Sequence, residues 1–126
     1  MQAALTLVLV AASGATAAPS APGPGRYAAT LCVATTAKAP PTCGAAEFDL
    51  RPGRQARVSV ADIVYRLDLR PEQVDVSTMH GKMLIDQFSA FYTWNANVLR
   101  FEDQDKHVRY EVKVGPRQQA TGRSPR

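Results

Sequence analysis

Histidine and cysteine, on which most metal sites and many catalytic sites depend, are scarce in this sequence. The 126 residues include two of each and a single tryptophan. The sequence lacks the Gly-x-Ser-x-Gly turn that presents a nucleophilic serine, and it lacks a glycine-rich loop for binding phosphate. The serines and histidines have no spacing that favours a catalytic pairing. We therefore expect a protein that is not an enzyme and that uses no cofactor.

Charged side chains are absent from the first 18 residues, where residues 3–12 are apolar apart from Thr6. About ten apolar residues are too few to cross a bilayer, which needs about 20, but they match the hydrophobic part of a secretory signal. The small residues Ala15 and Ala17 predict cleavage after Ala17, so residues 1–17 are interpreted as a signal peptide. No second apolar run follows, so we expect no transmembrane span and a periplasmic or secreted protein.

An excess of positive charge is confined to the C-terminal end. Lys and Arg balance Asp and Glu over residues 1–112, and the net charge of +4 comes from Lys113, Arg117, Arg123 and Arg126. Residues 115–126 contain no large apolar residue, which predicts a disordered basic tail. Since no aromatic residue interleaves these charges, nucleic-acid binding is not expected. We interpret the rest of the chain as a flexible N-terminal arm at residues 18–25 and a single β domain at residues 26–114.

The only two cysteines are Cys32 and Cys43. In an oxidising compartment, an even count of two predicts one disulfide. The spacing is not Cys-x-x-Cys and neither cysteine is near a histidine, which argues against a metal site. The abundance of Ala and of Arg over Lys also suggests a GC-rich, bacterial source.

Apolar and polar residues alternate in several segments, the cleanest being residues 108–114. This period of two is typical of half-buried strands. Turn-forming residues separate the segments at intervals that suit antiparallel neighbours. We predict an all-β fold, a small antiparallel meander that forms a barrel or sandwich of about eight strands. The period places these residues in its core: Phe48, Val58, Leu67, Leu99, Phe101, Tyr110 and Val112.

Residues 60–68 are compatible with two structures. Ile63, Tyr65 and Leu67 alternate as in a strand, whereas Val60, Ile63 and Leu67 also share one face of a helix, behind a possible capping box. The β-branched and aromatic residues favour the strand. The alternative is an α+β fold with one helix near residues 60–68.

Four of the nine aromatic residues lie in residues 88–94. Phe88, Tyr92 and Trp94 share one side of a strand and Phe91 has the opposite parity. The parity of the apolar positions changes after Ile85, which predicts a β-bulge near Asp86 and Gln87. Core packing is the favoured interpretation of this segment, and an exposed aromatic surface is the alternative.

Two short motifs contain possible metal ligands. Met79, His80 and Met83 offer two thioethers and an imidazole, which suit Cu(I). A hairpin turn at His80–Gly81 explains the same spacing without a metal. Residues 102–107 resemble part of a calcium loop, but they lack its glycine and its distal acid, so a polar turn is the simpler interpretation.

The sequence therefore supports three functional hypotheses. The first is an exported, monomeric, non-catalytic binding or inhibitory module of the bacterial cell envelope, whose unknown partner is a protein or an envelope polymer. Its predicted binding residues are Lys38, in the loop that the disulfide closes, and Tyr92 and Trp94. The second is a periplasmic copper-handling protein that uses Met79, His80 and Met83. The third is a structural envelope protein.

Overall fold

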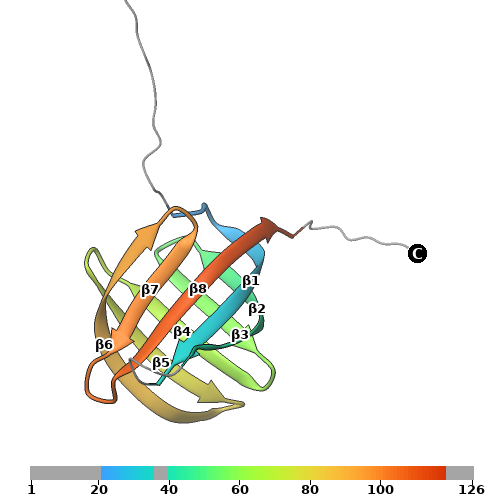
Figure 1. Ribbon diagram of the computed structural model, residues 1–126. Helices are drawn as coiled ribbons and strands as arrows, with labels where there is room; N and C mark the ends of the chain where they lie inside the picture. Colours follow the sequence, from blue (N-terminus) through green and yellow to red (C-terminus); the bar gives the residue numbers. More distant parts are fainter. Residues whose placement is uncertain (1–20, 36–39, 119–126) are drawn as a thin grey trace, which may run out of the picture.

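The structure, a computed structural model, describes residues 21–35 and 40–118. Eight antiparallel strands follow one another around a closed barrel, each pairing with the next and β8 pairing with β1 (Figure 1). The strands are β1 (Gly25–Ala34), β2 (Thr42–Arg51), β3 (Gln55–Val60), β4 (Ile63–Leu69), β5 (Gln73–His80), β6 (Met83–Asn95), β7 (Val98–Asp103) and β8 (Val108–Arg117). The predicted all-β meander is confirmed, and the barrel is the form it takes.

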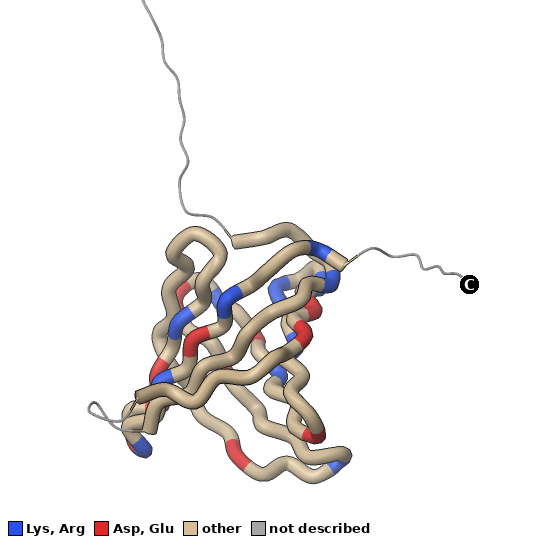
Figure 2. Tube along the Cα trace, turned by 45° about the vertical axis from the view of Figure 1, so that its right-hand side comes forward, with Lys and Arg blue, Asp and Glu red and all other residues tan. Residues whose placement is uncertain are grey.

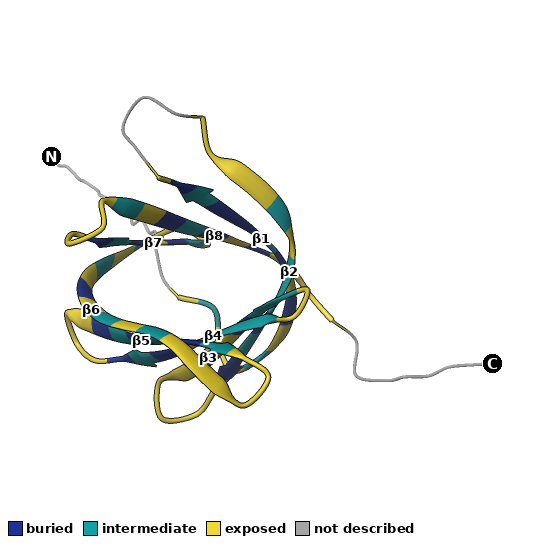
Figure 3. Ribbon diagram, turned by 90° about the horizontal axis from the view of Figure 1, so that it is seen from below, coloured by how far each residue is buried: buried dark blue, intermediate teal, exposed yellow. Residues whose placement is uncertain are grey.

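The alternation of apolar and polar residues determines which face of each strand is buried, as Figure 3 shows from one end of the barrel. Phe48, Leu99 and Val112 are fully buried in the interior. All seven core residues predicted from the period of two are buried, so that prediction is confirmed. Charged residues of both signs are interspersed along the strands (Figure 2).

The segment that was compatible with a helix is strand β4. It pairs with β3 and β5 along its length, and the two-residue turn Ala61–Asp62 precedes it. The α+β alternative is therefore wrong. A helix at this place would leave the facing edges of β3 and β5 unpaired, whereas strand β4 pairs with both of them.

Short turns join most of the strands. The β5–β6 turn consists of Gly81 and Lys82, one residue later than the His80–Gly81 turn expected from the sequence. Gly81 has a φ of 62°, the left-handed conformation that two-residue hairpin turns require at their first position. His80 is consequently the last residue of β5 and lies opposite Met83.

The N-terminal arm and the C-terminal end of the chain meet at one end of the barrel. β8 continues three residues beyond the expected domain boundary at 114, because Gly115 lets the chain pass close to the Ala28 carbonyl at a bulge. The Arg117 guanidinium lies 5.7 Å from the ring of Tyr27 and donates to the carbonyl of Pro24. Tyr27 donates to the Gly23 carbonyl at 2.6 Å, so residues 23–24 are held against the barrel.

Several sequence predictions fall on residues that the structure does not describe. The signal peptide at residues 1–17, the first three residues of the arm at 18–25, Lys38 and the tail beyond Gln118 lie outside the described residues. The part of the chain that is described contains no helix long and apolar enough to span a membrane.

Candidate functional site

Strand β6 changes its neighbour partway along its length. Residues 83–91 pair with β5, whereas residues 92–95 pair with β7. The β6–β7 ladder stops at the pair Tyr92 and Phe101, although β7 continues beside β8 to Asp103. We call the divergence of the two strands beyond this pair the fork, and residues 83–91 the β6 edge.

The β6 edge has β5 on one side and no strand on the other among the residues that the structure describes. In an antiparallel ladder, alternate residues direct their N–H and C=O groups to opposite sides of the strand. Beyond the bulge, every second residue of the β6 edge therefore directs its N–H and C=O groups to the fork, where no strand pairs with them; the Gln87 N–H donates instead to the Asp86 carboxylate at 2.9 Å. At the rise of a β-strand, this edge is about 30 Å long.

Exposed apolar side chains concentrate on the same segment. Within residues 21–35 and 40–118, four large hydrophobic residues are exposed, and all four belong to the β6 edge. Their exposed fractions are 63% for Met83, 50% for Leu84, 50% for Ile85 and 67% for Phe91. The barrel thus combines an unpaired backbone edge and its apolar surface in one strand.

A bulge explains why the first residues of β6 are apolar and exposed. Thr78 of β5 lies opposite Asp86 and Met79 lies opposite Leu84, so Ile85 is an extra residue without its own partner. This bulge lies next to the position predicted from the change in parity. It turns Asp86 toward the interior side of the strand, in line with Phe88 and Ala90.

Aromatic side chains close the barrel behind the fork. The ring of Phe88, from β6, lies 6.2 Å from that of Phe101 on β7 and is stacked on Tyr110 of β8 with centroids 5.7 Å apart. Phe101 and Tyr110 are themselves stacked at 5.1 Å. These contacts join the two sides of the fork where their backbones do not pair.

An ion pair also crosses the fork. The Lys106 ammonium, in the β7–β8 turn, lies 2.5 Å from the Asp86 carboxylate on β6 and 3.9 Å from that of Asp103. The hydrogen bond from Lys106 lowers the pKa of Asp86, and the hydrogen bond to Asp86 raises the pKa of Lys106. Both groups are therefore charged over the neutral range.

Two phenols lie beside this ion pair. Burial raises the pKa of Tyr110 to about 12, with smaller contributions from Tyr65, Asp86 and Asp103. Burial, and then the negative charge of Asp86, raise the pKa of Tyr65. The rings of Tyr65 and Tyr110 meet edge to face, with centroids 5.7 Å apart.

Alkaline pH should destabilise the barrel through Tyr110. The phenol ionises near pH 10 in an unfolded chain but stays neutral to about pH 12 in the folded one. The unfolded state therefore releases its proton first, and the free energy of unfolding falls as the pH rises from 10 to 12. Denaturant titrations across this range should show the fall. The fall should be smaller in Tyr110→Phe, and an equal fall in both proteins would contradict the assignment.

A groove of about 470 Å³ begins at the fork and crosses the outer face of β7 and β8. Phe91 lies at one end, and Ala34 and Pro41 lie at the other. Phe101 and Tyr110 also contribute to the lining. Its charged residues are two cations and two carboxylates: Arg100, Arg109, Glu102 and Glu111. The Arg100 guanidinium lies 2.6 Å from the Glu111 carboxylate, so the groove has little net charge.

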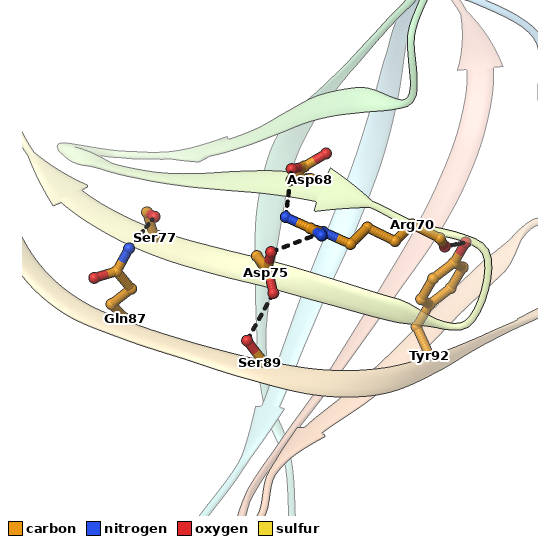
Figure 4. Close-up of polar contacts among 7 residues, drawn as sticks. All are labelled: Asp68, Arg70, Asp75, Ser77, Gln87, Ser89 and Tyr92. Atoms are coloured by element: carbon orange, nitrogen blue, oxygen red, sulfur yellow. Dashed lines mark hydrogen bonds and ion pairs between the residues drawn. The ribbon is translucent and has the colours of Figure 1, made fainter.

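The two aromatic residues proposed from the sequence as binding residues are half-buried and point toward the interior. The ring of Trp94 packs edge-on against Phe48, with centroids 6.1 Å apart. The Tyr92 hydroxyl donates to the Arg70 carbonyl at 2.5 Å (Figure 4). The exposed aromatic residue of this segment is Phe91, whose opposite parity was visible in the sequence.

The possible copper ligands are divided by the strand geometry. His80 lies opposite Met83, whereas Met79 lies opposite Leu84. Because successive residues of a strand point to opposite faces, Met79 is directed away from the face that His80 and Met83 share. Among the described residues there is no group of three or more His, Cys, Asp or Glu side chains placed to hold a metal ion.

Cys32 and Cys43 lie directly opposite each other on β1 and β2, with sulfur atoms at a bonding distance of 2.09 Å. They form a disulfide, as predicted. The bridge lies on the outer side of the barrel, where the β1–β2 loop begins and ends. It is compatible with an oxidising compartment.

The sequence reasoning missed the β6 edge because the feature depends on which strands pair, and over which residues. The only available signal was the apolar run at residues 83–85 followed by Phe91. The chain matches no known protein family, and no curated protein or solved structure was found to resemble it.

Proposed function

We propose that this protein is an exported, non-catalytic binding module of the bacterial cell envelope whose partner is another protein. It holds an extended segment of that partner along the β6 edge. The observation that carries this proposal is the coincidence of an unpaired strand edge with every exposed large hydrophobic side chain of the described residues.

Strand addition would use both features of the edge. The unpaired N–H and C=O groups of β6 would give the affinity through main-chain hydrogen bonds, and neighbouring side chains would recognise alternate residues of the segment. Phe91 and Leu84 are exposed near the two ends of the edge, and the groove beside Phe91 offers room for a side chain of the partner.

The composition of the edge also supports this use. Natural proteins protect unpaired edges with lysine, proline or short strands, because an exposed edge otherwise pairs with another chain. Residues 83–91 contain no proline and no lysine, and their one charged residue, Asp86, is neutralised by Lys106. The bulge at Ile85 and the inward-facing Asp86 protect the start of the edge, whereas residues 87–91 carry no such device and are suited to a binding role.

A protein segment suits this surface better than an envelope polymer does. The groove beside the fork has two charges of each sign, so it does not select a strongly charged chain. Backbone hydrogen bonding along a strand requires a polypeptide. Export is supported by the apolar run at residues 3–12 and by the disulfide, and a non-catalytic role by the scarcity of histidine.

Phage display against the immobilised protein tests the proposal. Peptides with apolar residues at alternate positions should be enriched, and in the isotope-labelled protein their binding should shift the amide signals of residues 83–91. Phe91→Lys should weaken the selected peptides about tenfold, because it removes an exposed apolar anchor. Gln55→Lys, which adds the same charge on the doubly paired strand β3, should leave their affinity unchanged.

Two outcomes would contradict the proposal. One is that the selected peptides bind Phe91→Lys and Gln55→Lys as tightly as the native protein and shift amide signals outside residues 83–91. The other is a dimer in sedimentation experiments that Phe91→Lys dissociates, which would make a second copy of the chain the occupant of the edge.

A further inference from the structure

The outer face of β2 to β6 carries two rows of side chains that cross the strands. One row runs through residues opposite each other in the ladders: Asp49, Arg57, Arg66, Ser77 and Gln87. The next row contains Arg51, Gln55, Asp68, Asp75 and Ser89. Each row places two like charges directly opposite each other, which destabilises a sheet unless a counter-ion is present.

The acidic pair has its counter-ion within the chain. Arg70 lies 3.7 Å from the Asp68 carboxylate and 3.0 Å from that of Asp75 (Figure 4). Ser89 donates a hydrogen bond of 2.6 Å to Asp75. The repulsion between Asp68 and Asp75 is therefore offset in the folded protein.

The basic pair has no such compensation. Within the described ranges, no carboxylate lies within 4.0 Å of the Arg57 or Arg66 guanidinium. The flanking acid, Asp49, is already shared by Arg26 at 3.8 Å and Arg51 at 3.5 Å. Two positive charges are thus held opposite each other without an anion between them.

The surroundings of the basic pair are polar. A groove of about 410 Å³ passes over Arg57 and Arg66 and is also lined by Arg51, Ser77 and Gln87. The Gln87 amide lies 3.5 Å from the Ser77 hydroxyl beside the pair (Figure 4). Asp68 and Asp75 also line the groove, and both are paired with Arg70.

We propose that Arg57 and Arg66 form a binding site for an oxyanion, the carboxylate, sulfate or phosphate group of a ligand. The planar donor fork of a guanidinium matches the oxygens of such groups. Ser77 and Gln87 supply further hydrogen-bond donors on the same row. The anion would lie between Arg57 and Arg66 and offset their repulsion, as Arg70 does for Asp68 and Asp75. Arg57 and Arg66 lie on β3 and β4, on the opposite side of β5 from the fork, and of the four residues only Gln87 belongs to the β6 edge. The site does not depend on the proposed strand addition.

Titration with sodium sulfate at low ionic strength, followed by the side-chain Nε–H signals of the arginines, tests the site. The signals of Arg57 and Arg66 should shift together along one saturable curve. Arg57→Gln and Arg66→Gln should each weaken the affinity about tenfold, because each removes a charged donor. Arg100→Gln is the matched control, since it removes the same charge from a guanidinium already paired with Glu111. It should leave the sulfate affinity unchanged.

Thermal unfolding provides a second readout. Sulfate should raise the midpoint of the native protein and of Arg100→Gln, and raise it less in the two site variants, because only the folded site binds. Equal responses in all four proteins, or shifts spread over all arginines, would overturn the proposal. Titrations with acetate and phosphate, and with sulfated, uronate-bearing and neutral polysaccharides, identify the source. Saturable binding of the neutral polymer at the same residues would contradict an oxyanion site.

Discussion

Phe101→Ala is expected to lower the free energy of unfolding by about 3 to 5 kcal/mol, the range for removing a buried phenylalanine ring. Phe101 is 5% exposed and stacks on Tyr110, and its ring also contacts Phe88 across the fork. Its loss leaves a cavity at the place where aromatic contacts replace backbone pairing. Denaturant unfolding followed by circular dichroism measures the change.

Phe48→Ala is the matched control for this variant. Phe48 is fully buried and packs against Tyr27 and Trp94, away from the fork. Both variants should lose similar stability, but only Phe101→Ala should accelerate amide hydrogen exchange along the β6 edge under native conditions. If Phe101→Ala costs less than about 1 kcal/mol, below the range for such truncations, the aromatic contacts do not hold the fork together.

Loss of the disulfide is expected to cost about 2 to 3 kcal/mol, which corresponds to a fall in Tm of roughly 10 to 20 °C for a domain of this size. Cys32 and Cys43 face each other across the β1–β2 ladder, and the bridge closes the loop between them. Its main effect is to restrict the unfolded chain. Thermal unfolding with and without a reductant measures the difference.

The double variant Cys32→Ala, Cys43→Ala separates this effect from other actions of the reductant. Its Tm should match that of the reduced native protein and should not respond to the reductant. A native protein whose Tm is unchanged by complete reduction would show that the bridge does not stabilise the barrel.

Much of the fold follows from local pattern. Alternation at Phe48, Val58 and Val112 assigns an inner and an outer face to each strand, and this assignment does not require knowledge of the neighbouring strands. The alternative helix at residues 60–68 could not be excluded locally, because its apolar residues suit both periods. The ladders that β4 completes with β3 and β5 decide between them.

Both candidate sites depend on register, which the sequence did not specify. The fork exists because β6 pairs with β7 only from Tyr92 onward. The basic pair exists because Arg57 lies opposite Arg66, and a shift by one residue would separate them. The same register directs Tyr92 and Trp94 inward and leaves Phe91 exposed. The sequence showed that Phe91 lies on the opposite side of the strand from Tyr92 and Trp94, but it did not show which side is exposed.

Amide hydrogen exchange of the isolated protein tests the open β6 edge most directly. β5 is paired on both sides, so its amides from Val74 to Thr78 should all exchange slowly. Along residues 88–91 of β6, beyond the bulge, slow and fast amides should alternate, because every second N–H faces the fork without a partner strand. Uniformly slow exchange along this segment would show that the edge is already paired and would contradict the proposed binding site.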